Sequence, residues 1–195
     1  MKTLFSLEGR NAWITGAAYG IGFAIAKAFV EAGIDNIIFN TSNEASMQKG
    51  LEAYREAGIQ LLVDEAAIID SAIVIIGRDD RTNRHRKPLD ALMSGLPLYG
   101  RGLGEGFSIL LDHQPYHLDR VEKAGVDFQL SGHTHRGQVW PISWITDHVY
   151  ECSWGSYQRG HTHYYISSGL GIWGGKFRIG TQSEYVVATL KRTEK

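Results

Sequence analysis

Three histidines follow two short apolar segments that predict neighbouring β-strands. His113 comes shortly after a predicted strand at residues 108–111, and Gly132-His133-Thr134-His135 follows a predicted strand at residues 128–131. A predicted helix at residues 118–124 separates these strands, so a right-handed crossover makes them parallel and brings their carboxyl ends to one sheet edge. A single histidine is more often a packed or solvated residue, but three that converge offer nitrogen ligands to a divalent metal. The sequence therefore predicts a metal site at His113, His133 and His135.

Other polar groups could extend this site. Asp79, Asp80 and Asp112 are candidate carboxylate ligands, although their spacing does not place them beside the histidines. The loop at residues 78–87 contains four arginines that could bind a phosphate, but its mixed charges favour a solvated loop. A second Gly-His-Thr-His contains His161 and His163, of which we expect His163 to be scaffold near the site and His161 to be incidental.

A glycine-rich turn near the N-terminus predicts a dinucleotide site. Thr15-Gly16-Ala17-Ala18-Tyr19-Gly20-Ile21-Gly22 lies between a predicted strand at residues 11–15 and a predicted helix at residues 21–32. Glycines permit close approach of the backbone to a pyrophosphate, and the helix N-terminus offers free N–H groups. The predicted cofactor-binding residues are Gly16, Tyr19, Gly20, Ile21 and Gly22.

This spacing, with the helix that follows, closely resembles the short-chain dehydrogenase/reductase family over residues 3–57, in particular its gluconate 5-dehydrogenase-like members. The resemblance implies binding of NAD or NADP. The end of the second predicted strand, residues 37–40, carries Asn40, Thr41 and Ser42 where an acidic residue would bind the ribose of NAD, so the choice of cofactor is open. The family's Tyr-x-x-x-Lys is absent, which favours a segment kept as a scaffold.

From residue 59 to residue 191 the chain resembles the C-terminal part of the calcineurin-like metallophosphoesterases. The matching motifs are Gly77-Arg-Asp-Asp, Leu110-Leu-Asp-His-Gln-Pro, Ser131-Gly-His-Thr-His-Arg-Gly-Gln and Tyr165-Ile-Ser-Ser-Gly-Leu-Gly-Ile-Trp. The resemblance implies that His113 and His133 bind one ion, which would be Mn, Zn or Fe, and that His135 binds a second. It also implies hydrolysis of a phosphomonoester or phosphodiester by a metal-activated hydroxide.

The family's upstream motifs are missing, namely Asp-x-His, Gly-Asp-x-x-Asp and Gly-Asn-His-Asp/Glu. The sequence identifies no candidate for a catalytic acid or base. Three hypotheses follow: a metal-binding phosphoesterase-like protein with weak or no turnover, an NAD(P)-binding dehydrogenase-like fragment, and a catalytically silent scaffold.

The predicted fold is α/β, with a partial Rossmann-like βαβα start at residues 1–57 continuing into the C-terminal half of a metallophosphoesterase sandwich at residues 58–195, as one hybrid unit. The start includes a helix after the capping box Thr41-x-x-Glu44. Strands are predicted at residues 61–63, 72–76, 164–167 and 184–190, and a loop at residues 96–106. The tryptophans Trp140, Trp144, Trp154 and Trp173 are expected to pack in the core or at its rim.

Composition limits the partners. The 195 residues carry 20 Lys and Arg against 21 Asp and Glu, so no overall field recruits nucleic acid or a membrane. The N-terminus lacks a signal-peptide pattern, and the single Cys152 fits a reducing, cytoplasmic setting, as a partly buried side chain. The expected partners are a small-molecule phosphoester or a dinucleotide, and unpaired sheet edges leave formation of a homo-oligomer open.

Overall fold

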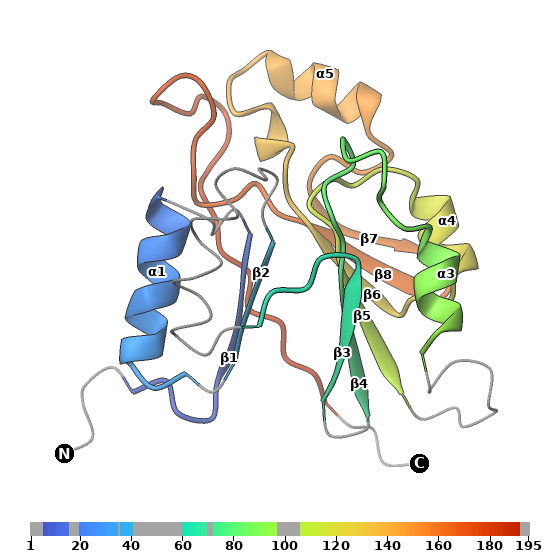
Figure 1. The fold of residues 1–195 in the computed structure, drawn as a ribbon. Helices are drawn as coiled ribbons and strands as arrows, with labels where there is room; N and C mark the ends of the chain where they lie inside the picture. Colours follow the sequence, from blue (N-terminus) through green and yellow to red (C-terminus); the bar gives the residue numbers. More distant parts are fainter. Residues whose placement is uncertain are drawn as a thin grey trace.

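The N-terminal part of the chain forms a strand, a helix and a second strand. The computed structural model describes residues 6–15, 20–34, 36–40, 60–69, 72–96 and 106–191. In it β1 spans Asn11–Thr15, α1 spans Gly20–Glu31 and β2 spans Asn36–Asn40, and the two strands pair in parallel. Ala26 of α1 and Ile37 of β2 are buried together, because the apolar side of the helix packs on the strand pair. The predicted strand–helix–strand start is confirmed (Figure 1).

The rest of the described chain is organised by a six-stranded sheet with the order β3-β4-β5-β6-β8-β7. Its strands are β3 (Glu65–Ile69), β4 (Ile73–Gly77), β5 (Phe107–Leu111), β6 (Phe128–Ser131), β7 (Gly155–Arg159) and β8 (Thr162–Ile166). The central strands β4, β5, β6 and β8 are parallel, and β3 and β7 run antiparallel at the two edges. The fold is therefore α/β with a mixed sheet, as predicted.

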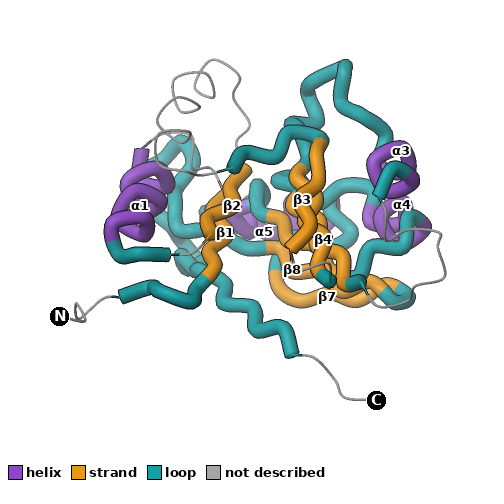
Figure 2. Tube along the Cα trace, turned by 60° about the horizontal axis from the view of Figure 1, so that its bottom comes forward, coloured by secondary structure: helices purple, strands orange, loops and turns teal. Residues whose placement is uncertain are grey.

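Both faces of this sheet are apolar, because successive side chains on a strand point to opposite sides. On one side Val74, Ile76 and Leu110 pack with α3 (Leu89–Ser94) and α4 (Leu118–Lys123). On the other side Ile75 and Ile109 pack with Leu62. Figures 1 and 2 show α3 and α4 on one side of the sheet, and the β1–β2 pair with α1 on the opposite side.

Two predicted strands are wrong. Residues 61–63 are not a strand, because Asp64 turns the chain with φ of 50° while its carboxylate accepts the N–H groups of Asp79 and Lys87, so that β3 begins one residue later. Residues 184–190 are mainly apolar, but no neighbouring strand pairs with them in the described structure. The helix expected after Thr41 falls in residues 41–59 and most of the loop expected at 96–106 falls in residues 97–105, which lie outside the described residues.

The chain after β6 contains elements that the sequence did not predict. The 3-10 helix η1 (His135–Gly137) follows β6 and leads into α5 (Ile142–Val149), and β7 pairs with β8. Trp140, Trp144 and Trp173 are 55%, 66% and 74% exposed, so of the two expected positions, in the core or at its rim, the core is excluded for them. No helix in the described part of the chain has the length and apolar character needed to cross a membrane.

Candidate functional site

The carboxyl ends of the four parallel strands meet at one edge of the sheet. Backbone hydrogen bonds continue the ladder past the strands, from Arg78 N to Leu111 O (2.9 Å), from Gly132 N to His113 O (3.0 Å) and from Ser167 N to Ser131 O (2.8 Å). This register places residues 78–80, 112–113, 132–133 and 167–168 side by side. The predicted convergence of β5 and β6 at this edge is confirmed by their parallel pairing.

His113 and His133 are in contact at this edge. Their ring centroids are 5.1 Å apart, and the ring planes are inclined by 79°. Burial, followed by the proximity of His133, lowers the pKa of His113 to about 4, and burial also lowers the pKa of His133. Both imidazoles are therefore neutral at pH 7, which is the form that binds a metal ion.

His135 lies in a different environment. The guanidinium of Arg178 approaches its ring, with Nη2 3.4 Å from Nδ1, and donates to the carbonyl oxygens of Ser168 (2.8 Å) and Gly171 (2.5 Å). Burial lowers the pKa of His135, and the charges of Arg178 and His133 add to this effect. Arg178 Nη2 therefore lies within hydrogen-bonding reach of the His135 ring, while the carbonyl groups of Ser168 and Gly171 act on the pKa of His135 in the opposite direction.

The structure thus brings two of the three predicted metal ligands into contact. Within the described ranges, no three His, Cys, Asp or Glu side chains are grouped closely enough to hold one metal ion. His113 and His133 form the pair, and His135 is coupled to them through its charge but is held by Arg178.

One carboxylate faces the histidine pair. The charge of Asp80 raises the pKa of both His113 and His133, opposing their burial. One Asp80 oxygen accepts the N–H of Thr82 at 2.8 Å. Of the other two candidate carboxylates, Asp79 binds Asn83, and Asp112 is paired with Arg86 and has a pKa raised by burial. Asp80 is therefore the carboxylate whose charge acts on the pair, although the three side chains are not grouped closely enough in the described structure to hold one ion together.

The loop that carries His133 and His135 has an unusual backbone. His133, His135, Arg136 and Gln138 have φ values of 68°, 49°, 50° and 56°, in the left-handed region that non-glycine residues seldom occupy. Buried Thr134 anchors the loop by donating to Ser153 O at 2.6 Å. Backbone strain of this kind clusters at functional sites, where surrounding contacts enforce it.

The arginine-rich loop is exposed over residues 81–85, as expected, whereas Arg78 and Arg86 are engaged within the protein. Arg78 is buried beside Asp64, with its Nε 3.5 Å from the carboxylate, and Arg86 is paired with Asp112. Arg81 stacks on the ring of Tyr116, with 4.0 Å between its guanidinium carbon and the ring centroid. Carboxylates within the protein therefore hold Arg78 and Arg86, whereas Arg81 and Arg84 are exposed.

The second pair of histidines lies away from the site. His163 in β8 is level with Phe128, the first residue of β6, whereas His133 follows the last residue of that strand. His161 is exposed in the turn between β7 and β8. His163 therefore does not line the site, and of the two roles expected for it, substrate-lining or structural, the position in β8 favours the structural one.

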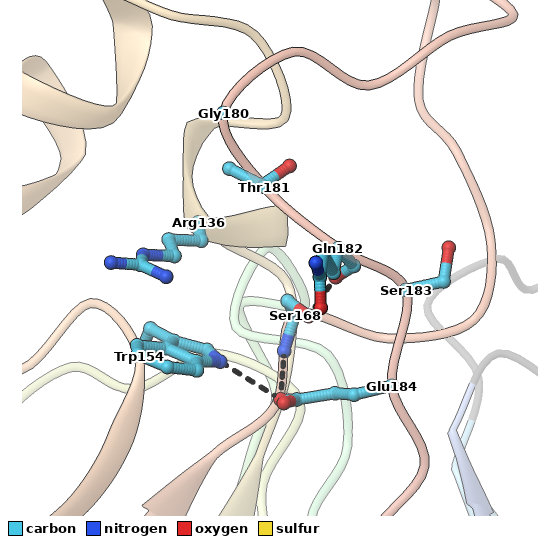
Figure 3. A pocket seen from close by; sticks show the side chains of 8 residues that line it. All are labelled: Arg136, Trp154, Ser168, Gly180, Thr181, Gln182, Ser183 and Glu184. Carbon is cyan, nitrogen blue, oxygen red and sulfur yellow. Dashed lines mark hydrogen bonds between the residues drawn. The ribbon is translucent and has the colours of Figure 1, made fainter.

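A pocket of about 440 Å³ lies beside the histidine loop and was not anticipated. Arg136 covers the ring of Trp154 at 3.9 Å, and Glu184 accepts both Trp154 Nε1 (3.0 Å) and Ser168 N (2.7 Å), as Figure 3 shows. Its wall combines Arg136 of η1, Trp154 just before β7, Ser168 shortly after β8, and residues 180–184. Because these segments are distant in sequence, no local sequence pattern indicated the pocket.

The predicted dinucleotide turn is described only in part. Gly20, Ile21 and Gly22 form the first turn of α1, which follows β1 as expected. Gly16 and Tyr19 lie outside the described residues. The helix N-terminus at the carboxyl end of a parallel strand is the arrangement that phosphate binding requires.

Comparison with known proteins supports both resemblances. No protein-family model matches the chain. It is 40% identical over 85 residues to an uncharacterized metallophosphoesterase of Campylobacter jejuni, covering 43% of this chain and 23% of that protein. It is 41% identical over 117 residues to the uncharacterized metallophosphoesterase YkuE of Bacillus subtilis, covering 54% of this chain and 40% of that protein.

The chain is also 35% identical over 75 residues to a sorbose reductase of Schizosaccharomyces pombe, covering 38% of this chain and 29% of that protein. The mixed resemblance to metallophosphoesterases and short-chain dehydrogenases is therefore confirmed. The match spans less than half the length of each of these relatives.

Proposed function

We propose that the chain binds one divalent metal ion between His113 and His133 and is a phosphoesterase-like protein with weak or no turnover. The observation that carries this proposal is the contact of two neutral imidazoles, 5.1 Å apart, at the carboxyl edge of the sheet. Similarity to proteins named metallophosphoesterases supports the reaction class.

The residues present fit such an ion in part. His113 and His133 offer lone pairs, and the charge of Asp80 favours a cation beside them. A bound divalent ion would supply Lewis acidity and lower the pKa of a water molecule. The chain's own contribution is to lower the pKa of both imidazoles by partial burial and to fix His133 through the left-handed loop anchored at Thr134.

Weak turnover follows from the charges around the pair. Asp80 is the carboxylate that faces the two rings, among the residues described, so little negative charge is available to hold two cations close together. A two-metal displacement needs both ions about 3.5–4 Å apart. We therefore expect metal binding without efficient hydrolysis.

The test is calorimetric titration of the full chain with MnCl₂ and ZnCl₂, comparing His133→Ala with His163→Ala. Both side chains are exposed, but His163 lies away from the site, so it controls for non-specific imidazole binding. We expect His133→Ala to weaken metal binding by more than about 100-fold, because even the loss of a residue that only orients a metal ligand weakens binding by up to this factor. His163→Ala should have no effect on metal binding. Equal affinities in the two variants, or no binding by the parent chain, would refute the proposal. Hydrolysis of an aryl phosphodiester by the metal-loaded chain measures turnover separately.

A second function, NAD(P) binding at the glycine turn, is supported by the parallel β1–β2 pair with α1 starting at Gly20. A ligand at 100 times its dissociation constant adds about 2.7 kcal/mol to the stability of its binding unit. Thermal denaturation with NAD(H) and NADP(H) should therefore show a higher melting temperature, and Gly22→Val should abolish the shift. If neither cofactor raises the melting temperature, this second function is excluded.

A further inference from the structure

The pocket beside the histidine loop is lined by a cation and a carboxylate that do not pair with each other. Its volume of about 440 Å³ lies in the range of sites that bind small molecules. Arg136 and Glu184 both line it, yet no ion pair joins them. Opposite charges that share a pocket gain free energy by pairing. The side chain that keeps them apart therefore decides what the pocket can bind.

Trp154 lies between the two charges. The guanidinium carbon of Arg136 is 3.9 Å from the centre of the Trp154 ring, over one face. At the edge of the same ring, Trp154 Nε1 donates to Glu184 Oε1 at 3.0 Å. Figure 3 shows Arg136 above the indole and the Glu184 carboxylate beside it. The indole thus fixes a positive and a negative group at two separate positions in the pocket.

The carboxylate of Glu184 is held in place but keeps acceptor capacity. Ser168 N donates to the oxygen that Trp154 also uses, at 2.7 Å. Burial, followed by the charge of Glu184, raises the pKa of Tyr165, so this hydroxyl stays protonated and can donate to the carboxylate as well. An ionised carboxylate has about four acceptor sites, so it can accept a further donor from a ligand.

The guanidinium of Arg136 has unused donors. Within the residues that the structure describes, its side chain forms no ion pair or hydrogen bond and contacts only the face of Trp154. Arg178 differs, because its guanidinium donates to the carbonyl oxygens of Ser168 and Gly169 and does not line the pocket. Burial lowers the pKa of Arg178, and the charge of Glu184 opposes this effect. Arg136 is therefore the cation that the pocket offers to a ligand.

We propose that this pocket binds a small zwitterion, a polar α-amino acid, with the ligand's carboxylate on Arg136 and its ammonium group on Glu184. A guanidinium can donate two parallel N–H bonds to a carboxylate, and hydrogen bonds between charged groups are roughly twice as strong as neutral ones. Residues 181–183 add two hydroxyl groups and an amide to the wall, which favour a polar side chain on the ligand.

Ligands of other charge fit the pocket less well. An anion would lie beside the carboxylate of Glu184, and a cation would lie beside the guanidinium of Arg136, so each gains one attraction and meets one repulsion. A neutral polyol could form hydrogen bonds but would leave both charges of the pocket without a counter-charge. The proposal does not rest on metal binding by His113 and His133.

The test follows the indole N–H resonance of Trp154 in heteronuclear NMR spectra of the full chain, without metal, during titration with L-glutamine. Trp154→Phe identifies the resonance by removing it. Two analogues are titrated in parallel: glutaramate lacks the ammonium group, and γ-aminobutyramide lacks the carboxylate. We expect L-glutamine to shift the resonance in a saturable manner. Each analogue should bind at least about tenfold more weakly, because it loses a hydrogen bond between charged groups.

Two variants separate the roles of the charges. Glu184→Gln keeps an acceptor oxygen for Trp154 and Ser168 but removes the negative charge, so it should weaken binding of L-glutamine at least about tenfold and leave glutaramate binding no weaker. Arg136→Met should weaken binding of L-glutamine to a similar degree and leave γ-aminobutyramide binding no weaker. The control is Arg120→Met, because Arg120 is an exposed cation of α4 that does not line the pocket.

Three results would overturn the proposal: no saturable shift with L-glutamine, equal binding of L-glutamine and either analogue, or equal binding of L-glutamine by Glu184→Gln and Arg120→Met. The dispersion of the NMR spectrum checks the folding of each variant. Because the titration is made without metal, its failure would leave the proposed metal site standing.

Discussion

Gly137→Ala tests whether the histidine loop is fixed by its contact with α5. Gly137 is the last residue of η1 and has a φ of 72°. A Cβ atom there would lie 2.4 Å from Ser143 N, 2.5 Å from Ser143 Cα and 2.7 Å from the carbonyl carbon of Ile142. All three atoms belong to the backbone of α5, so the methyl group fits only if the helix moves.

The expected loss of stability has two parts. The left-handed conformation costs a residue with a Cβ about 1–2 kcal/mol. Overpacking against atoms that cannot rotate away adds about 1–3 kcal/mol. The free energy of unfolding should therefore fall by about 2–5 kcal/mol. In a chain of this size, each kcal/mol lowers the melting temperature by roughly 2–4 °C.

The matched control is Gly174→Ala, because Gly174 also has a left-handed φ, 66°, but has open space where its Cβ would lie. Only the conformational cost, about 1–2 kcal/mol, applies to it. Urea denaturation of both variants measures the difference, which should be at least about 1 kcal/mol. Equal losses would show that α5 does not press on the loop, and the reasoning about how His133 is positioned would fail.

Three further outcomes are expected. In the metal-free protein, the unfolded His113 binds a proton below about pH 6.5 while the folded one does not until about pH 4, so the free energy of unfolding should fall as the pH drops through this window. The total is about 3 kcal/mol, and urea denaturation in a pH series should show a shallower fall for His113→Asn. Arg178→Met should destabilise the protein by about 2–3 kcal/mol in thermal denaturation, because its guanidinium donates to the carbonyl oxygens of Ser168, Gly169 and Gly171; full recovery in Arg178→Lys would show that charge alone suffices. Thr134→Val should lower the free energy of unfolding in urea denaturation by about 1–3 kcal/mol, because the buried carbonyl oxygen of Ser153 loses its hydrogen-bond donor. Thr134→Ser keeps the hydroxyl and should retain most of the stability.

The strands that position the histidine pair could be predicted because they depend on local sequence. β6 coincides with the predicted residues 128–131, and β5 begins one residue early. The helix between them fixes their parallel order, since such crossovers are right-handed. The meeting of His113 and His133 follows from these two facts.

The environment of His135 could not be predicted, because it depends on contacts between distant segments. Arg178 is 43 residues away along the chain, and it reaches His135 only after residues 168–180 fold back over the end of β8. The prediction of a strand at residues 184–190 was wrong for a related reason, because a β-strand forms only where a neighbouring strand pairs with it. The apolar, β-branched composition of this segment favours a strand, but it carries no information about a pairing partner.

The charge beside His135 decides how many ions the site can hold. Resemblance alone implies a second ion at this residue, yet Arg178 Nη2 is 3.4 Å from Nδ1 of its ring. At roughly 5–6 Å and an effective dielectric constant of about 20, a divalent ion and a guanidinium repel by roughly 6 kcal/mol. The His113–His133 pair instead faces the carboxylate of Asp80. We therefore expect titration with Mn²⁺ to saturate at one equivalent, and uptake of two would show that Arg178 moves away from His135 when metal binds.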